Sequence, residues 1–122
     1  VSIGNPHALL RVEDTAHCRI GELGPVIESH PDFPRRCNVS FLQVMGRDEI
    51  RLRVYERGAG ETLACGSGAC AAVVYGRLRG WLDEQVTAHL AGGKLCIAWT
   101  GEGYAVRATG PTAVVFDGSI RL

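Results

Sequence analysis

The feature that most constrains the fold is one segment, residues 66–79 (GSGACAAVVYGRLR), which has helix-forming character and is small and apolar on nearly every side. No charged residue interrupts it before Arg77, and Gly80 follows as a plausible C-terminal cap. A helix that is apolar all round is buried within a protein, because no face of it suits water. We therefore expect the rest of the chain to surround this helix.

Short stretches typical of strands lie on both sides of that segment. Within residues 50–56, for example, Ile50, Leu52 and Val54 alternate with other side chains, and a Gly-Gly pair at 92–93 predicts a hairpin. The predicted strands are 8–13, 38–45, 50–56, 86–91, 94–99, 104–109 and 112–116, with a further helix over 19–29. Together they predict the α+β class, with a curled, mixed, barrel-like β-sheet around one central buried α-helix.

Size and charge exclude several classes of function. The chain has 122 residues, enough for one domain, and its 13 basic residues balance 13 acidic ones. This balance argues against nucleic acid as a partner, because a nucleic-acid surface needs a basic excess. No apolar run reaches the length of a membrane span, so we expect no membrane association. The chain begins at Val1 without a methionine, inside a motif, and we expect a piece of a longer protein.

The cysteines bear on location and on metal binding. There are five, an odd number, and no secretory segment opens the chain, so we expect reduced thiols in a cytoplasmic protein. A zinc site is the competing idea, since His17, Cys18, His30 and Cys37 lie within one stretch. Their spacing matches no closed ligand pattern, and we predict that the chain binds no metal.

Cys65 stands where a glycine-rich loop meets the apolar helix. A thiol at a helix N-terminus faces the positive end of the helix dipole and unpaired N–H groups, which favour the thiolate. Gly66, Ser67 and Gly68 keep bulk away from those N–H groups, so that a carboxylate could approach them. The alternative is a buried cysteine that serves only packing, and position alone leaves both interpretations open.

The residues around Cys65 form a longer motif. The string 56–72 (ERGAGETLACGSGACAA) resembles the second-cysteine signature of the diaminopimelate epimerase family. Two further segments resemble that family in the same order, namely Gly-Asn-Pro-His at 4–7 and Asn-Val at 38–39. Proline racemases share the Cys-Gly-Ser/Thr-Gly core but not the surrounding string. The resemblance extends over nearly the whole chain.

This resemblance implies a role for each matching residue. Cys65 would be one of two cysteines that face opposite sides of the substrate α-carbon, and the backbone N–H groups of Gly66 and Ser67 would bind the α-carboxylate. Another group would hold the distal amino-acid end of the substrate or orient the reacting centre: Asn5, Asn38, Glu56 and Arg57. His7 and Glu56 would adjust the protonation of the cysteine pair.

It also implies a reaction, which is the conversion of LL-2,6-diaminopimelate to the meso form in lysine and peptidoglycan biosynthesis. Inversion of an α-carbon requires a base on one face and an acid on the other, and cysteine suits both roles. We predict no cofactor. The only lysine, Lys94, lies in the predicted hairpin, where it is not placed to form a Schiff base with pyridoxal phosphate.

The family fold consists of two similar domains with the active site between them, so residues 1–122 would be the C-terminal catalytic half. The resemblance implies that the first catalytic cysteine lies in an upstream motif of the Cys-Gly-Asn-Gly type. This motif is missing here, because Cys65 is the only cysteine that glycine follows. We therefore expect three kinds of partner: a small amino-acid substrate, the N-terminal half of the same protein, and, as a further option, a second copy in a homodimer. The isolated chain should fold but be inactive.

Several alternatives remain open. The parent protein could be a related racemase of the proline or hydroxyproline type, a cysteine hydrolase or acyltransferase that uses Cys65 with His7, or a binding module without catalysis. Outside the motif, Glu56 and Arg57 would be interpreted as an exposed ion pair, and His7 as a structural histidine. By the same reasoning Asn5 would form a turn and Asn38 would cap a strand.

Overall fold

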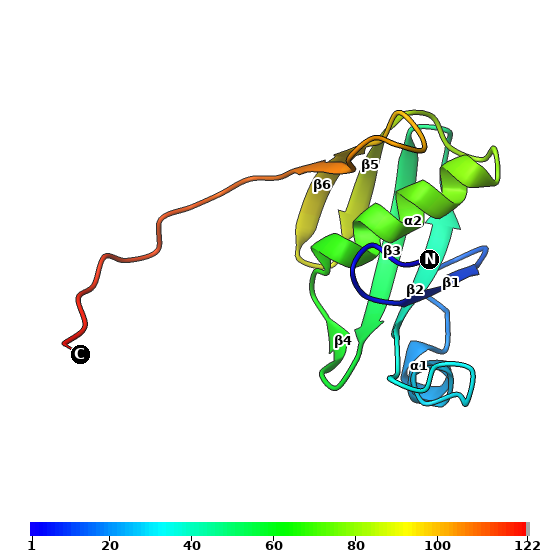
Figure 1. Cartoon of the computed structure of the whole chain (residues 1–122), viewed down its shortest axis with the longest axis horizontal. Helices are drawn as coiled ribbons and strands as arrows, with labels where there is room; N and C mark the ends of the chain where they lie inside the picture. Colours follow the sequence, from blue (N-terminus) through cyan, green and yellow to red (C-terminus); the bar gives the residue numbers. More distant parts are fainter. Residues whose placement is uncertain (122) are drawn as a thin grey trace.

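The computed structural model describes residues 1–121 and contains two helices and a mixed β-sheet (Figure 1). The elements follow in the order β1 (His7–Arg11), α1 (Ile20–Glu28), β2 (Asn38–Val44), β3 (Glu49–Glu56), β4 (Gly60–Thr62), α2 (Gly66–Leu78), β5 (Gln85–Leu90), β6 (Gly93–Ala98) and β7 (Arg107–Thr109). The predicted α+β class is confirmed. No helix within residues 1–121 is both long and apolar enough to cross a membrane.

The sheet has the strand order β1-β2-β3-β5-β6-β7, and β4 pairs with β3 outside this path. Two neighbouring pairs, β1 with β2 and β3 with β5, are parallel, and the other pairs are antiparallel. Parallel neighbours need a crossover connection, and the two helices supply them. Helix α1 lies in the connection from β1 to β2, and α2 lies in the connection from β3 to β5.

The two helices cover opposite faces of the sheet. On β2, the side chains of Val39 and Phe41 belong to a core that includes Ile20 of α1. Leu42, the next residue along, belongs to the larger core that includes Ala69 and other residues of α2. Successive strand residues point to opposite faces, so β2 is buried on both sides and separates the two cores.

Helix α2 is buried at seven of its thirteen residues, as its apolar composition predicts. Figure 1 shows it lying across the sheet. It approaches β1 and β2 at one edge of the sheet and β6 and β7 at the other, which requires the sheet to curl around it. The buried residues of the helix are Gly68, Ala69, Ala71, Ala72, Val73, Val74 and Gly76. The predicted curled sheet around a central buried helix is confirmed.

Three details differ from the sequence-based expectation. The predicted strand at 112–116 is wrong, since those residues are exposed and lie in the extended tail that leaves the sheet (orange to red in Figure 1). Strand β7 pairs Thr109 with Cys96, and in that register residue 112 would already face Gly93, where β6 begins. Further residues therefore have no partner on β6. Strand β4 was not predicted, and the β5–β6 turn is formed by residues 91–92, not 92–93.

Candidate active site

Cys65 is the N-cap of α2, and its side chain closes the first turn of that helix. Its backbone is extended, with φ −136° and ψ 102°, and its Sγ accepts a hydrogen bond from the Gly68 N–H at 3.3 Å. The Ser67 hydroxyl lies 3.5 Å from the same sulfur. The residue is 5% exposed. A thiolate at this position would be stabilised by both donors and by the helix dipole.

The next two backbone N–H groups, those of Gly66 and Ser67, form no hydrogen bond within residues 1–121. They belong to the first turn of a helix, where N–H groups have no intrahelical acceptor and attract anions. An added Cβ at Gly66 would meet no atom within 4 Å, so the approach to these donors is open. At Gly68, in contrast, an added Cβ would lie 3.2 Å from Val54 and 3.3 Å from the Cys65 sulfur.

Glu56 and Arg57 lie at the end of β3, where a short turn leads into β4. A hydrogen bond of 2.5 Å from the Thr62 hydroxyl holds Oε1 of Glu56, and the Nη1 of Arg57 donates to the Arg35 carbonyl at 3.0 Å. The two side chains therefore do not form the ion pair considered as an alternative. Arg57 is exposed, and the rest of its guanidinium makes no hydrogen bond within residues 1–121.

Asn5, His7 and Asn38 lie beside that turn at the same end of the sheet. His7 and Asn38 are register partners on β1 and β2. The Oδ1 of Asn38 accepts the backbone N–H of Arg57 at 2.8 Å, which ties β2 to the turn. The Nδ2 group of Asn38 is unused within residues 1–121. Asn5 turns its Oδ1 toward the Nε2 of His7 at 3.2 Å.

His7 is 2% exposed, and burial is the main reason that its pKa lies below the usual value. The carboxylate of Glu56 acts in the opposite direction and raises the pKa. A neutral ring that donates from Nε2 to Asn5 leaves Nδ1 as an acceptor, and this atom is buried without a partner in residues 1–121. No hydrogen bond joins His7 to Cys65 in this part of the chain, so the pairing that a cysteine hydrolase needs is not observed.

The other cysteines lie outside this constellation. Cys70 is half-buried on α2, and burial followed by the proximity of Cys65 raises its pKa. Cys37 is fully buried in the α1 core, where burial raises its pKa as well. Residues 1–121 contain no group of three or more His, Cys, Asp or Glu side chains arranged to hold a metal ion.

Two residues of the site escaped the sequence analysis. Thr62, in the unpredicted strand β4, orients the Glu56 carboxylate. Glu28 is the last residue of α1, and its side chain accepts a hydrogen bond of 2.8 Å from the backbone N–H of Gly58. Gly58 directly follows Arg57 in the chain. Thr62 lies within the recognised motif and could have been considered. Glu28 carries no sequence signal, because its partner is 30 residues away.

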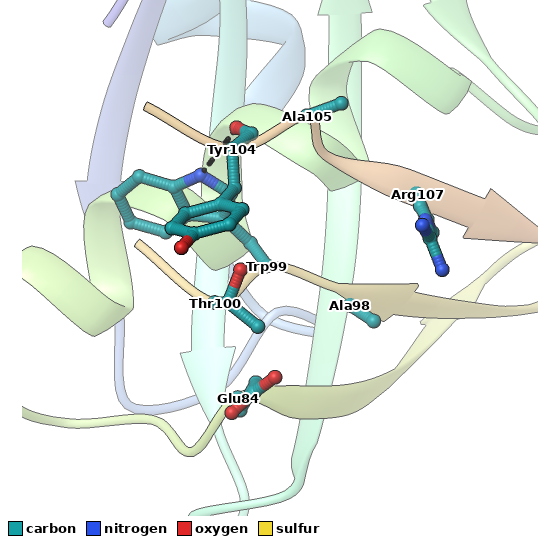
Figure 2. Close-up of a pocket in the computed structure, with 7 residues that line it drawn as sticks. All are labelled: Glu84, Ala98, Trp99, Thr100, Tyr104, Ala105 and Arg107. Carbon is teal, nitrogen blue, oxygen red and sulfur yellow. Dashed lines mark hydrogen bonds between the residues drawn. The ribbon is translucent and has the colours of Figure 1, made fainter. Parts of the chain in front are cut away.

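A hollow of about 250 Å³ lies elsewhere on the domain and contains none of the predicted site residues (Figure 2). Trp99 and Tyr104 form one wall, where the indole Nε1 donates to the Tyr104 carbonyl at 3.2 Å. The other lining residues are Glu84, Ala98, Thr100, Ala105 and Arg107. This hollow borders the end of β6, whereas the loop before Cys65 contacts the β5–β6 turn, just before β6 begins, through the hydrogen bond from Gly92 N–H to Leu63 O.

Solved structures with a similar fold support this architecture. A phenazine biosynthesis protein of the PhzF family from Enterococcus faecalis matches with a TM-score of 0.62 at 17% identity, over 81% of this chain and 35% of that one. A protein described as a predicted epimerase from Pseudomonas aeruginosa matches with a TM-score of 0.58 at 17% identity, over 87% of this chain and 37% of that one. At these identities the likeness shows a shared fold.

Sequence comparison is more specific. The chain is 64% identical to the diaminopimelate epimerase of Alkalilimnicola ehrlichii and 62% identical to that of Halorhodospira halophila, in each case over all 122 residues. It spans 44% and 42% of the length of those proteins, less than half of each. The family model described as diaminopimelate epimerase matches residues 1–115. The chain therefore belongs to the diaminopimelate epimerase family.

Proposed function

We propose that this chain supplies one of two cysteines for the epimerisation of LL-2,6-diaminopimelate to the meso form, without pyridoxal phosphate. The reaction would serve lysine and peptidoglycan biosynthesis in the cytoplasm. One observation carries the proposal: the Cys65 sulfur caps α2 directly beside the N–H groups of Gly66 and Ser67, which have no acceptor within residues 1–121. A base and a carboxylate cradle are thus adjacent, and α-proton abstraction from an amino acid needs both.

In the proposed reaction, the Cys65 thiolate removes the α-proton while the Gly66 and Ser67 N–H groups bind the α-carboxylate. Negative charge spreads onto that carboxylate as the C–H bond breaks. Fixed donors and the dipole of α2 stabilise this charge without reorganisation, which is a large term in many enzymes. This electrostatic term takes the place of a pyridoxal electron sink.

The second proton transfer would come from a cysteine in the N-terminal half of the parent protein. The extended tail supports the proposal that this chain contacts another half. Its apolar residues Val114, Val115 and Phe116 are 86%, 87% and 82% exposed. Apolar side chains grouped in this way mark interaction surfaces. We propose that the N-terminal half covers them in the complete protein.

The distal end of the substrate carries a second carboxylate and a second amine. The exposed Arg57 guanidinium would bind that carboxylate, and the Asn38 amide would donate to it from Nδ2. The Glu56 carboxylate, held by Thr62, would bind the distal amine or assist in the protonation of the cysteines. Asn5 and His7 would support this end through their mutual hydrogen bond.

A chimera tests the proposal. This chain would replace the matching 122 residues of the Alkalilimnicola ehrlichii enzyme, to which it is 64% identical. We expect solvent deuterium to enter the α-carbon of diaminopimelate, and Cys65→Ser to abolish this uptake. Loss of a bidentate contact costs about 1.5–3 kcal/mol, so Arg57→Lys should lower kcat/KM about ten- to a hundredfold.

Arg107→Lys is the matched control, because Arg107 is also exposed but borders the hollow of Figure 2. It should leave kcat/KM unchanged. A folded chimera that binds diaminopimelate without deuterium uptake would identify a binding module. Uptake with proline but not diaminopimelate would identify a racemase of the related type. Either result would reject the proposed substrate reaction.

A further inference from the structure

Glu28 is a buried carboxylate in an unfavourable position. It is 6% exposed and is the last residue of α1. Burial of a carboxylate is costly, and the C-terminal end of a helix disfavours negative charge. The last turn of α1 contains no basic residue that would offset this charge. The interactions that compensate for both penalties must come from outside the helix.

The main compensating interaction is with the turn that carries Arg57. The Oε1 of Glu28 accepts the Gly58 N–H at 2.8 Å, and the Nη1 of Arg36 lies 3.6 Å from the same oxygen. Gly58 has φ 77°, a conformation that glycine adopts readily and other residues rarely do. The carboxylate therefore fixes the turn at the point where its backbone reverses direction.

Three hydrogen bonds together hold this turn, and each comes from a different part of the chain. Asn38 accepts the N–H of Arg57, Glu28 accepts the N–H of the next residue, and the Arg35 carbonyl accepts from the Arg57 side chain. Arg36, adjacent to that carbonyl, is the only residue other than glycine with positive φ in residues 1–121, at 58°. Strained backbone of this kind is typical of ligand clamps.

We propose that Glu28 is a positioning residue that aims the Arg57 guanidinium and thereby sets the specificity for substrates with a second carboxylate. This inference rests on the proposed function of the site. The role depends on the reach of the side chain to the Gly58 N–H and not on its charge, because the bond has a backbone donor. Glutamine can make the same bond, whereas aspartate is one methylene too short.

The test uses the same chimera with the Alkalilimnicola ehrlichii enzyme, with deuterium uptake measured against substrate concentration. We expect Glu28→Asp and Glu28→Ala to raise the KM for diaminopimelate about tenfold, which corresponds to the loss of one charge-assisted contact. Glu28→Gln should stay within about threefold of the parent, since it retains the acceptor. Glu22→Gln is the control, because Glu22 is an exposed residue of α1 that pairs with Arg19.

Lysine, which is diaminopimelate without one carboxylate, separates positioning from general damage. If Glu28 aims Arg57, Glu28→Asp should lower kcat/KM for diaminopimelate and leave the slower uptake into lysine unchanged. An equal loss with both substrates would overturn the proposal. So would a Glu28→Asp variant that matches the parent, or a Glu28→Gln variant as impaired as Glu28→Asp.

The two proposals fail in different ways. No uptake by the parent chimera, or no effect of Arg57→Lys, would reject the proposed function. A raised KM in Arg57→Lys together with an unchanged KM in Glu28→Asp would reject only the role of Glu28. Melting temperatures of all variants identify any that unfold. Glu28→Gln, which keeps the size and shape of the side chain, keeps the test decisive if Glu28→Ala does not fold.

Discussion

Two identical substitutions in α1 should have opposite effects on stability. Gly24 faces the sheet, and a Cβ added there would lie 2.5 Å from Cγ and 2.9 Å from Cβ of Tyr55. These atoms form the base of the tyrosine side chain, so a change of rotamer cannot remove both clashes. Gly21, in the same helix, would meet no atom within 4 Å. We expect Gly24→Ala to destabilise the domain and Gly21→Ala to stabilise it.

The magnitudes follow from two opposing effects. Alanine is favoured over glycine by about 0.8–1.0 kcal/mol at an interior position of a helix. In the first turn of a helix, where Gly21 lies, this preference is smaller. Gly21→Ala should therefore raise the free energy of unfolding by about 0.5 kcal/mol. At Gly24 the same gain is opposed by overpacking, which costs about 1–3 kcal/mol. Because the Cβ of Tyr55 cannot move aside, we expect a cost at the upper end of this range, which leaves a net loss of about 2 kcal/mol.

Urea unfolding of the 122-residue chain, followed by far-UV circular dichroism, measures both effects. The predicted difference of about 2.5 kcal/mol is well above the uncertainty of linear extrapolation. Tyr55→Ala in the Gly24→Ala background is a further control, since it removes the Cγ at 2.5 Å and keeps only the Cβ contact at 2.9 Å, so the two substitutions should show coupling. The reasoning is refuted if Gly24→Ala is as stable as Gly21→Ala.

Two other predictions concern packing and pH. Gly76→Ala should destabilise the domain by about 1–2 kcal/mol, because the new Cβ would clash with Cδ1 of Leu82 and lie 2.7 Å from its Cγ. In urea unfolding, the Gly76→Ala/Leu82→Ala pair should show a smaller loss than the sum of the single losses. The free energy of unfolding should fall as the pH drops below about 6.5, because the unfolded chain then binds a proton that the buried His7, with its lowered pKa, does not bind in the folded state. His7→Gln should make the urea midpoint less dependent on pH between about pH 5 and 7. An equally steep pH profile in both proteins would contradict this prediction.

Local patterns were sufficient for the largest elements of the fold. The alternation of Ile50, Leu52 and Val54 predicted their burial, and these residues are 0%, 1% and 1% exposed. The apolar segment after Cys65 predicted α2 because its burial depends only on its own composition. Elements whose existence depends on a distant partner were harder to predict. The three-residue strand β4 forms only by pairing with β3, and residues 112–116 have strand composition but no neighbour in register.

The same limit applies to the site. Cys65, Gly66 and Ser67 are consecutive, so their proximity follows from the sequence, and the resemblance supplied the more distant residues. Neither source predicted how the turn after β3 is held. The Asn38 oxygen binds the Arg57 backbone, and Glu28 binds Gly58, through contacts that span 19 and 30 residues. Hydrogen bonds of this kind depend on the packing of α1 against the sheet, which no local pattern encodes.

The position of Cys65 bears on why one domain would be insufficient for epimerisation. Its sulfur is held by the Gly68 N–H at the start of a buried helix, so it can reach only one face of a bound α-carbon. Inversion requires a second proton-transfer group on the opposite face. Cys70 cannot supply it, because it lies five residues farther along the same helix and would approach a bound α-carbon from the same side as Cys65. If the proposed function is correct, the second group must come from outside residues 1–121. Attachment of the partner half would then complete the catalytic pair, and it would also bury the apolar tail.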